Sequence, residues 1–388
     1  MTDELSELRT ALDDVDRRLV DLLVERIDVV SRVAKYKAVS GRKVRDPVRE
    51  KQLTERLARL AGEAGLDPHF VTRVVREILE HSVRLQEELI ASTLDPARGA
   101  KASLVVGYQG GEGAYSHIAA LRHFGARSKG LVCEGFSDFP SMLEAVKSGY
   151  LDYAILPIEN SIAGSINESY DLLARMDLFL VGEVIQPVEH CLIALADVPL
   201  THVRRVYSHP VALAQCGRFL RGLVDCHFEA YTDTALAVAK IRDDQDPSQA
   251  AIASEEAARL YGLPVIRRDI ADQAANFTRM VIVAREPEAS DPRIPCKTSL
   301  ILSTRHEKGA LYRCIEVLSR HGLNLTKLES RPKPGTAFEY LFYVDFEGNV
   351  ADEGASAAIE ALDPSTEFVR VLGSYPRRTE SKGAPSDE

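Results

Sequence analysis

The first forty residues carry an apolar seam that constrains the fold more than any other feature of the chain. Apolar residues recur with heptad-like spacing at Leu5, Leu8, Leu12, Val15, Leu19, Leu22, Val29, Val33 and Tyr36. This spacing predicts one helix of about 35 residues, near 50 Å long at about 1.5 Å per residue. A compact domain of about 95 residues is only about 30–35 Å across. We therefore expect the helix to extend beyond its own domain and a second copy of the chain to cover it.

Composition divides the 388-residue chain into three segments. Residues 1–95 hold two of the 25 aromatic residues and three of the 24 Gly, and are predicted to be all helical. Residues 103–286 alternate short apolar runs with helical patterns, which is typical of an α/β domain. Residues 297–376 follow the strand–helix–strand–strand–helix–strand order of a ferredoxin-like unit. A connector with three prolines, residues 286–296, separates the last two segments.

Charge and composition exclude several classes of function. With 48 Lys and Arg against 58 Asp and Glu, the net charge is −10, which argues against a nucleic-acid-binding protein. The chain starts with acidic residues instead of a secretory signal, and no apolar run approaches the roughly 18 residues of a membrane span. The six Cys show no metal-binding spacing, and no nucleotide-binding fingerprint is present. We expect a cytoplasmic protein without metal, cofactor, nucleic-acid or membrane partner.

Cations interrupt the apolar seam of the first helix. Arg26 stands where the spacing requires an apolar residue, and Lys37 follows 11 residues, about three turns, later on nearly the same face. Arg9 is rotated roughly 100° from Arg26 on a straight helix. This rotation allows Arg9 to serve a site of a partner chain instead of its own.

Two shorter helices follow and contribute further polar residues. Asp46 is predicted to cap a helix that carries Arg49 and Glu50. On the third helix the apolar stripe continues onto Ser82 and Gln86, which need hydrogen-bond partners at such positions. Taken singly, each charge is better explained by surface ion pairs and extended side chains. Taken together, these residues indicate a polar pocket for a dianion inside a helical bundle.

Residues 5–92 resemble the all-helical chorismate mutases, in which chorismate undergoes a Claisen rearrangement. This reaction needs the reactive conformer held in place and donors directed at the charge that develops on the breaking C–O bond. The resemblance assigns Arg26 and the Arg9 of a partner chain to the two substrate carboxylates. It assigns Lys37 and Gln86 to the ether oxygen. The supporting residues that it implies are Glu50 at the ring hydroxyl, Asp46, Arg49 and Ser82.

In the middle segment, small polar residues stand beside four predicted strands, as at the ligand crevice of an open α/β sheet. A Gly-rich turn before a helix, like residues 109–116, offers backbone N–H groups to an anion. His209 could act as a base, but a His before a proline in a turn is more often structural, which is the interpretation preferred here. No Ser–His–Asp order suggests acyl transfer. The polar residues at the other strand ends are Asn160 and Ser161, Ser208 with Gln215 on the following helix, and Asn276–Arg279.

The motifs Gly113–Ser116, Pro157–Ser161, Tyr207–Pro210 and Asn276–Arg279 resemble prephenate dehydratase over about 180 residues. The resemblance implies two lobes with a cleft, like the periplasmic binding proteins. It also implies a reaction that expels CO2 and hydroxide together and makes the ring aromatic. The family usually places Phe after the Thr-Arg pair, whereas this chain has Met280.

The same resemblance implies roles for single residues in the cleft. Thr278 is the expected proton donor, although a Thr hydroxyl is a poor acid and needs a neighbouring group or water to assist it. Arg279 is expected to bind a substrate carboxylate through bidentate hydrogen bonds. The expected orienting groups are Asn160, Ser161, Ser208 and Gln215.

In the third segment, the runs Lys308–Leu311 and Glu329–Pro332 resemble the ACT regulatory domain of the phenylalanine-sensing kind. Gly309 allows backbone N–H groups to approach a ligand carboxylate at a helix start. The alternative is a dimerisation module that pairs through an edge strand without a ligand. The effector-binding residues that the resemblance implies are Gly309, Ala310, Leu311, Asn324, Leu325 and Glu329.

Together the three segments predict a bifunctional enzyme of phenylalanine biosynthesis, acting as a homodimer or higher homo-oligomer. It would convert chorismate to prephenate and prephenate to phenylpyruvate, with feedback inhibition by phenylalanine. Two alternatives from other classes are a non-catalytic small-molecule receptor and a transcriptional amino-acid sensor. A nearer alternative is an arogenate dehydratase, which the cleft motifs do not distinguish from a prephenate dehydratase.

Overall fold

The structure is a computed structural model that describes residues 2–94, 103–125, 130–291 and 293–378. It forms two compact units, which are described separately. One unit comprises residues 1–101 together with 291–295, and the other comprises residues 102–290 together with 296–388. The first unit is therefore discontinuous in sequence.

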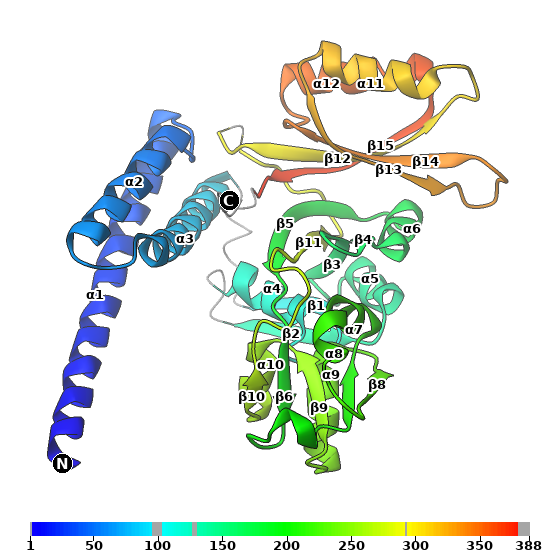
Figure 1. The fold of residues 1–388 in the computed structure, drawn as a ribbon. Coiled ribbons are helices and arrows are strands. Elements are labelled where there is room, and N and C mark those ends of the chain that lie inside the picture. Colours follow the sequence, from blue (N-terminus) through cyan, green and yellow to red (C-terminus); the bar gives the residue numbers. More distant parts are fainter. Residues whose placement is uncertain (1, 95–102, 126–129, 292, 379–388) are drawn as a thin grey trace. The chain divides into compact units, whose positions relative to one another are not determined.

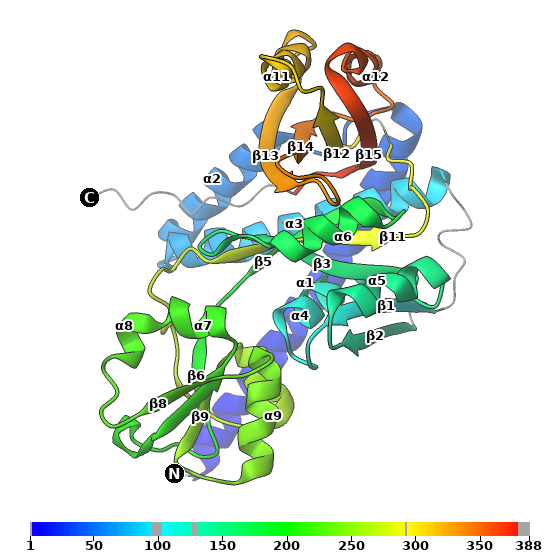
Figure 2. The same ribbon diagram turned by 90° about the vertical axis from the view of Figure 1, so that its right-hand side faces the viewer.

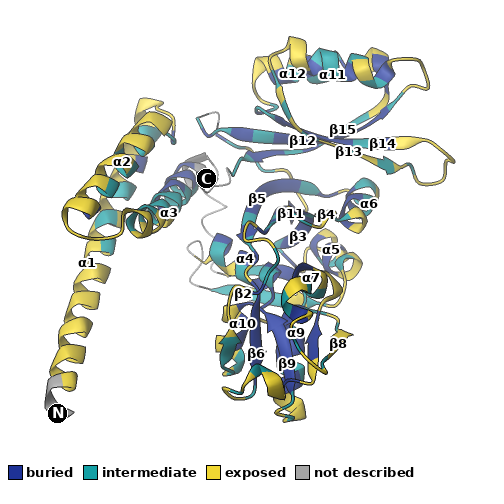
Figure 3. Ribbon diagram, in the orientation of Figure 1, coloured by how far each residue is buried: buried dark blue, intermediate teal, exposed yellow. Residues whose placement is uncertain are grey.

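The first unit contains the helices α1 (Thr2–Ser40), α2 (Pro47–Glu63) and α3 (Pro68–Leu94) (Figure 1). The predicted single long helix is confirmed, because α1 has 39 residues and a length of about 58 Å. Every side chain from Leu5 to Val20 is exposed (Figure 3). The apolar seam of this half of α1 is therefore not covered by any described residue of its own chain.

The core of the first unit lies at the C-terminal end of α1. Val44, which follows α1, packs against Val83 and Ile90 of α3. Ile294 from the discontinuous segment joins the same cluster, and Ala38 of α1 packs against it. This core is small because α1 presents only its second half to the other helices.

The α/β part of the second unit begins with a six-stranded sheet in the order β2-β1-β3-β11-β5, to which β4 is added beside β3. Strand β1 pairs in parallel with β2 and β3, whereas β11 is antiparallel to β3 and β5. The elements are β1 (Leu104–Gln109), α4 (Tyr115–Phe124), β2 (Leu131–Phe136), α5 (Phe139–Ser148), β3 (Tyr153–Asn160), β4 (Gly164–Ser165), α6 (Asn167–Arg175), β5 (Phe179–Pro187) and β11 (Phe277–Ala284).

A second sheet, ordered β10-β6-β9-β7-β8, forms the other lobe, and the chain then returns to the first sheet through β11. This two-lobed α/β arrangement agrees with the prediction (Figure 2). The elements are β6 (Cys191–Ala194), η1 (Leu200–His202), β7 (Arg205–Ser208), α7 (Pro210–Gln215), α8 (Gly217–Leu220), β8 (His227–Ala230), α9 (Thr234–Asp244), β9 (Gln249–Ala253), α10 (Glu255–Tyr261) and β10 (Val265–Arg267).

The last part of the second unit is an antiparallel sheet in the order β13-β14-β12-β15, covered on one face by α11 and α12 (Figure 2). Its element order is the predicted strand–helix–strand–strand–helix–strand order. The elements are β12 (Cys296–Thr304), α11 (Ala310–Arg320), β13 (Asn324–Pro332), β14 (Tyr340–Glu347), α12 (Glu353–Glu360), η2 (Asp363–Ser365) and β15 (Thr366–Pro376).

The open face of this sheet shares a core with the first α/β lobe. Tyr343 and Leu372 belong to the same buried cluster as Tyr170 and Leu180. A Cβ at Gly373 would collide with the carbonyl oxygen of Leu180, so only glycine permits this approach of β15 to β5. Composition suggested separate segments, but these two are packed as one body.

Candidate active sites

In the first unit, polar side chains gather where α1 faces α3. Arg26 Nη1 donates a hydrogen bond to Ser82 Oγ, and the Ser82 hydroxyl donates in turn to the Ile78 carbonyl at 2.6 Å. Gln86 Nε2 donates to the Ser82 carbonyl at 3.2 Å, while the buried Gln86 Oε1 has no hydrogen-bond partner among the described residues. An unsatisfied buried oxygen in a native fold requires an explanation, and a bound ligand would supply one.

Lys37 lies in a second group of polar residues in this unit, near the start of α2. Its Nζ donates to the Val44 carbonyl at 2.5 Å. Burial lowers the pKa of the Lys37 ammonium, and the nearby carboxylates of Asp46 and Glu50 oppose that effect. Burial also lowers the pKa of Arg26. Both cations are thus partly withdrawn from water, which strengthens their interaction with an anion.

Acidic residues and Arg45 complete this region. The Asp46 carboxylate accepts the Arg49 N–H at 3.0 Å, so it caps α2 as predicted. Arg45 holds both oxygens of Glu80, at 2.9 and 2.8 Å, and lies 3.7 Å from Glu50 Oε2. Arg45 was not singled out from the sequence, because it lies between two helices where periodicity carries no information.

Arg9 is exposed on the first half of α1. It precedes Arg26 by 17 residues, which is about 25 Å along a helix. Within one chain, Arg9 and Arg26 therefore cannot contact one small ligand together.

In the second unit, a buried hydrogen-bond network surrounds Thr278. Asn160 Nδ2 lies 3.0 Å from Thr278 Oγ1 and 2.9 Å from Asn276 Oδ1. Gln215 Nε2 donates to Asn160 Oδ1 at 3.1 Å, and Gln215 Oε1 accepts from Asn276 Nδ2 at 2.9 Å. Gln215 comes from the second lobe, so the network joins both lobes.

The antiparallel pairing of β3 and β11 explains why these residues meet. Thr278, at the start of β11, pairs with Asn160, at the end of β3. The register then shifts, so that Arg279 pairs with Glu159 and Met280 with Pro157. Such bulges redirect side chains and are frequent beside active sites. The motif Asn276–Arg279 was expected to precede the strand, but most of it lies within β11.

Two residues to which the sequence analysis assigned no role, one of them within the motif Gly113–Ser116, extend the network. His190 is buried, and its Nε2 lies 2.9 Å from Gln215 Oε1. The Tyr115 hydroxyl donates to the Glu189 carbonyl at 2.6 Å and lies 3.1 Å from His190 Nδ1. Burial lowers the pKa of His190, so the neutral imidazole is favoured in this environment. No local pattern identifies His190, because it stands in an irregular connection between strands.

The sequence models of two families match these two regions. The model of chorismate mutase type II matches residues 8–87, and that of prephenate dehydratase matches residues 106–288. The bifunctional chorismate mutase/prephenate dehydratase of Escherichia coli strain K12 is 36% identical over 378 residues, which is 97% of each chain. The chain belongs to this bifunctional family. It combines a chorismate mutase domain in the first unit with a prephenate dehydratase domain in the second.

Two other relatives bear on the dehydratase. The chloroplastic arogenate dehydratase/prephenate dehydratase 2 of Arabidopsis thaliana is 42% identical over 323 residues, covering 80% of this chain and 83% of its own. The structure of prephenate dehydratase from Arthrobacter aurescens in complex with L-Phe is 26% identical, with a TM-score of 0.64. It matches 71% of this chain and 90% of its own. No helix in the described part of the chain is long and apolar enough to cross a membrane.

The prediction for Arg279 requires correction. Consecutive residues of a strand point to opposite faces of its sheet, so Thr278 and Arg279 do not share a cleft. Arg279 Nε donates to Glu183 at 2.8 Å, Nη1 to Asp345 at 2.6 Å, and Nη2 to the Tyr375 hydroxyl at 3.0 Å. Burial opposes the charge, but Tyr375, Asp345 and Glu183 outweigh it and raise the pKa of Arg279 well above its ordinary value. Arg279 therefore ties the dehydratase sheet to the C-terminal sheet.

Two of the expected orienting groups have structural partners instead. The buried Ser208 hydroxyl donates to the Ile252 carbonyl at 2.6 Å, so it fixes β7 against β9. Ser161 lies at the exposed rim, where its Oγ accepts the Phe277 N–H at 2.9 Å. His209 Nδ1 accepts the Val211 N–H at 3.3 Å and caps α7, which agrees with its structural interpretation.

The Gly-rich turn after β1 packs between the lobes, and two of its glycine N–H groups are directed at protein side chains. The Gly111 N–H points to Asp233 Oδ1 at 3.4 Å, and the Gly113 N–H donates to His117 Nδ1 at 3.0 Å. A Cβ at Gly110, where φ is +107°, would lie 2.7 Å from Asp233 Oδ2. Glycine is needed at this position because α9 of the other lobe approaches so closely.

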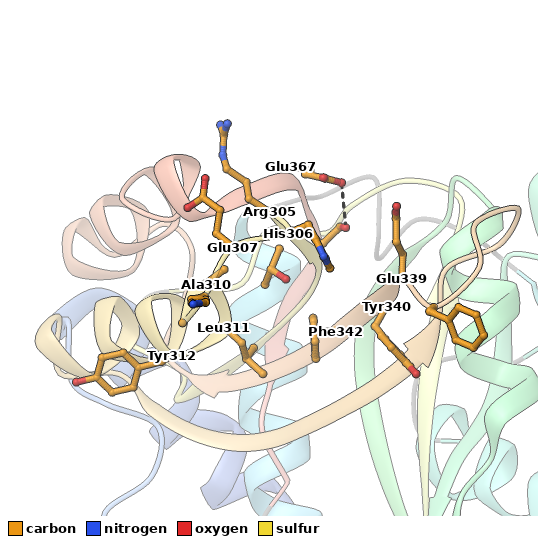
Figure 4. A pocket seen from close by; sticks show the side chains of 15 residues that line it. Arg305, His306, Glu307, Ala310, Leu311, Tyr312, Glu339, Tyr340, Phe342 and Glu367 are labelled. Atoms are coloured by element: carbon orange, nitrogen blue, oxygen red, sulfur yellow. Dashed lines mark hydrogen bonds between the residues drawn. The ribbon is translucent and has the colours of Figure 1, made fainter.

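The C-terminal part contains a cavity of about 610 Å³ at the loop before α11 (Figure 4). Gly309, Ala310 and Leu311 line it, with Tyr340 and Phe342 from β14. Gly309 has φ of +75° and stands at the N-terminus of α11. Three of the six expected effector-binding residues are thus brought together.

The other three do not line this cavity in the same chain. Asn324 pairs with Glu347, whereas β14 meets the loop end of β12 at Leu341, so Asn324 and the neighbouring Leu325 lie at the opposite end of the sheet. Glu329 accepts a hydrogen bond from Ser165 Oγ at 2.5 Å and so faces the dehydratase sheet. The resemblance implies an effector site at a subunit interface, so the role of these three residues stays a prediction.

Proposed function

We propose that the first unit rearranges chorismate through cations that position the substrate and stabilise its transition state. Arg26 would bind a carboxylate beside Ser82, and Gln86 would use its second Nε2 hydrogen toward the ether oxygen. Lys37 Nζ has three hydrogens, so it would donate to the same oxygen while keeping its hydrogen bond to the Val44 carbonyl. A preorganised donor at developing charge is the main catalytic contribution available to such a site.

The mutase site is proposed to be completed by a second copy of the chain. Arg9 lies too far from Arg26 to serve the same site, and the seam around it is exposed. A homodimer in which the α1 helices pair would cover the seam and bring Arg9 of each chain to its partner's site. Glu50 would hold the ring hydroxyl. Asp46 and Arg49 would support it by fixing the start of α2.

Thr278 is proposed to protonate the departing hydroxyl of prephenate. This role is supported by the hydrogen bonds of Thr278. Its Oγ1 accepts a hydrogen bond from Asn160 Nδ2, while no described group accepts one from the Thr278 hydroxyl. A hydrogen bond to the oxygen favours its ionised form, so Asn160 makes Thr278 a better acid. Gln215, Asn276 and His190 hold Asn160 in place, and aromatisation supplies the driving force.

The C-terminal part is proposed to be an ACT domain that binds phenylalanine at Gly309–Leu311. Backbone N–H groups at the start of α11 would hold the carboxylate, and Leu311 and Phe342 would contact the ring. The supporting observations are the cavity and the described Arthrobacter complex with L-Phe. Asn324 would contribute only from a partner chain. The Arg279 cluster connects this domain to the strand that carries Thr278, so it offers a route for inhibition.

A direct assay of the purified chain tests the proposal. Chorismate should disappear, and prephenate should give phenylpyruvate at a rate that added phenylalanine lowers. Arogenate should be offered in parallel, because the Arabidopsis relative is named for both substrates. Turnover of arogenate alone would overturn the prephenate assignment, and turnover of neither substrate would overturn the proposed role of the cleft.

A further inference from the structure

A short segment of the connector belongs to the mutase unit. Residues 291–295 cluster with the helices, although the residues on both sides, Ser290 and Cys296, belong to the other unit. Ile294 is buried against Val44, Val83 and Ile90. These contacts make the segment a part of the unit's core instead of a free linker.

Arg293 caps the C-terminal end of α1. Its Nη1 lies 3.0 Å from the Lys37 carbonyl and 2.6 Å from the Ala38 carbonyl. The Lys37 carbonyl also accepts the Gly41 N–H at 3.1 Å. Carbonyls at the end of a helix carry partial negative charge, so a guanidinium is a favourable additional donor there. The cap lies at the very residue whose ammonium is proposed to act on the substrate.

Asp291 holds the guanidinium of Arg293 in position. Arg293 Nε lies 2.6 Å from Asp291 Oδ1, and Nη2 lies 2.5 Å from Oδ2. The Asp291 side chain is 2% exposed. A bidentate pair of this kind fixes both distance and orientation. Arg293 is thus a preorganised donor and not a flexible surface side chain.

The segment also reaches the other end of the Lys37 side chain. The Val44 N–H points to the Arg293 carbonyl at 3.5 Å, and the Val44 carbonyl accepts from Lys37 Nζ at 2.5 Å. Arg293 therefore contacts the backbone of Lys37 directly and its ammonium through one intervening residue.

We propose that Arg293 is a positioning residue of the mutase, which sets the place of Lys37 through the end of α1 and through Val44. The inference rests on the role proposed above for Lys37. Displacement of a catalytic group by about 1 Å can cost up to roughly 10²-fold in rate, so loss of this contact should be visible in turnover.

The test compares Arg293→Ala with Arg285→Ala in the full chain. Arg285 lies directly before the connector, is more than half exposed and pairs only loosely with Glu286 at 3.7 Å, so it controls for the loss of charge. We expect Arg293→Ala to lower mutase kcat roughly tenfold with KM changed less than threefold. Dehydratase turnover should stay at the wild-type value in both variants. Arg293→Lys, which keeps one donor for the helix carbonyls, should recover part of the loss.

A double-mutant cycle with Lys37→Ala separates positioning from general stability. If Arg293 acts through Lys37, the Arg293→Ala change should have little further effect on the residual mutase rate of Lys37→Ala. The inference is overturned if Arg293→Ala lowers the mutase rate by the same factor in the wild-type and Lys37→Ala backgrounds. It is also overturned if mutase kcat in Arg293→Ala is no lower than in Arg285→Ala. Wild-type mutase activity in Lys37→Ala alone would instead overturn the proposed role of Lys37.

Discussion

The mutase and dehydratase sites differ in how much of each is built within one chain. Thr278, Asn160, Asn276 and Gln215 are hydrogen-bonded to one another in a buried network of a single chain. In the mutase unit, half of α1 is exposed and Arg9 is separated from the remaining cations. The dehydratase should therefore depend on packing within the chain, whereas the mutase should depend on association as well.

The largest expected effect tests the self-contained site. Thr278→Ala removes the proposed proton donor and should lower dehydratase kcat by roughly 10²–10⁴-fold. Thr278→Ser, which keeps the hydroxyl, is the matched control and should retain most activity. Mutase turnover should remain within a few-fold of wild type in both variants. A parallel fall of both activities in a folded variant would contradict the separation of the two sites.

Arg26→Ala makes the corresponding change in the mutase site. Loss of one preorganised donor should lower mutase turnover by roughly 10²–10³-fold and leave dehydration unchanged. Arg32→Ala, an exposed arginine later on the same helix, provides the comparison. If the two variants retain the same chorismate turnover, Arg26 is only a surface cation that pairs with Ser82.

The third prediction addresses association directly. Leu12 is 62% exposed, and Leu12→Asp places a charge in the proposed contact between two α1 helices. Mutase activity should fall at least roughly tenfold together with dissociation of the oligomer, because Arg9 is lost from the partner's site. Arg17→Asp, on the face of α1 away from the seam, should affect both much less. Light scattering and both assays on the same samples decide the outcome.

Gly309→Val tests whether the effector cavity acts on the dehydratase. A β-branched residue at φ of +75° is strained and would displace the N–H groups at the start of α11. The phenylalanine concentration for half inhibition should rise roughly tenfold, because the loss of one hydrogen bond to the ligand costs about 1.4 kcal/mol. The dehydration rate without phenylalanine should not change. Gly322→Val introduces the same strain at the other end of α11, where φ is +72°. Equal loss of inhibition in both variants would assign the effect to the fold instead of the cavity.

The smallest expected effect concerns pH. The mutase needs protonated Lys37, and burial lowers the pKa of this ammonium from the ordinary 10.5. The mutase rate should therefore fall as pH rises through a value below 10.5, while the charge of Arg26 remains. Lys37→Arg keeps its charge throughout this range, so the alkaline fall should disappear in that variant. If the mutase rate of Lys37→Arg still falls at the same pH as in the wild type, the titrating group is not Lys37.

The sequence predicted features that depend on local periodicity. The spacing of the α1 seam and the cap at Asp46 each specify a structure within a few residues, and both are found. The alternation of side chains in β11 also held the information that Thr278 and Arg279 face opposite ways. This opposite orientation was not predicted, because the motif Asn276–Arg279 was expected to lie before the strand.

Features that depend on tertiary packing left no comparable signal. Glu183 and Asp345 stand on different sheets, and nothing in their surroundings along the chain marks them as partners of Arg279. The same holds for His190 beside Gln215 and for Asn324 at the far end of its strand from Gly309. Residue types identified the chemistry of these sites, but only the paired strands determine which side chains meet.

The discontinuous mutase unit has a consequence for how such a gene can be rearranged. Recombination that transfers a coding region ending after α3 would leave Arg293 and Ile294 behind. The transferred helices would then expose Val44, Val83 and Ile90, which Ile294 covers in this chain. A substitution at any of these three positions constrains the size of residue 294. The connector and the helices should therefore accumulate changes together, even though a whole enzyme domain is encoded between them.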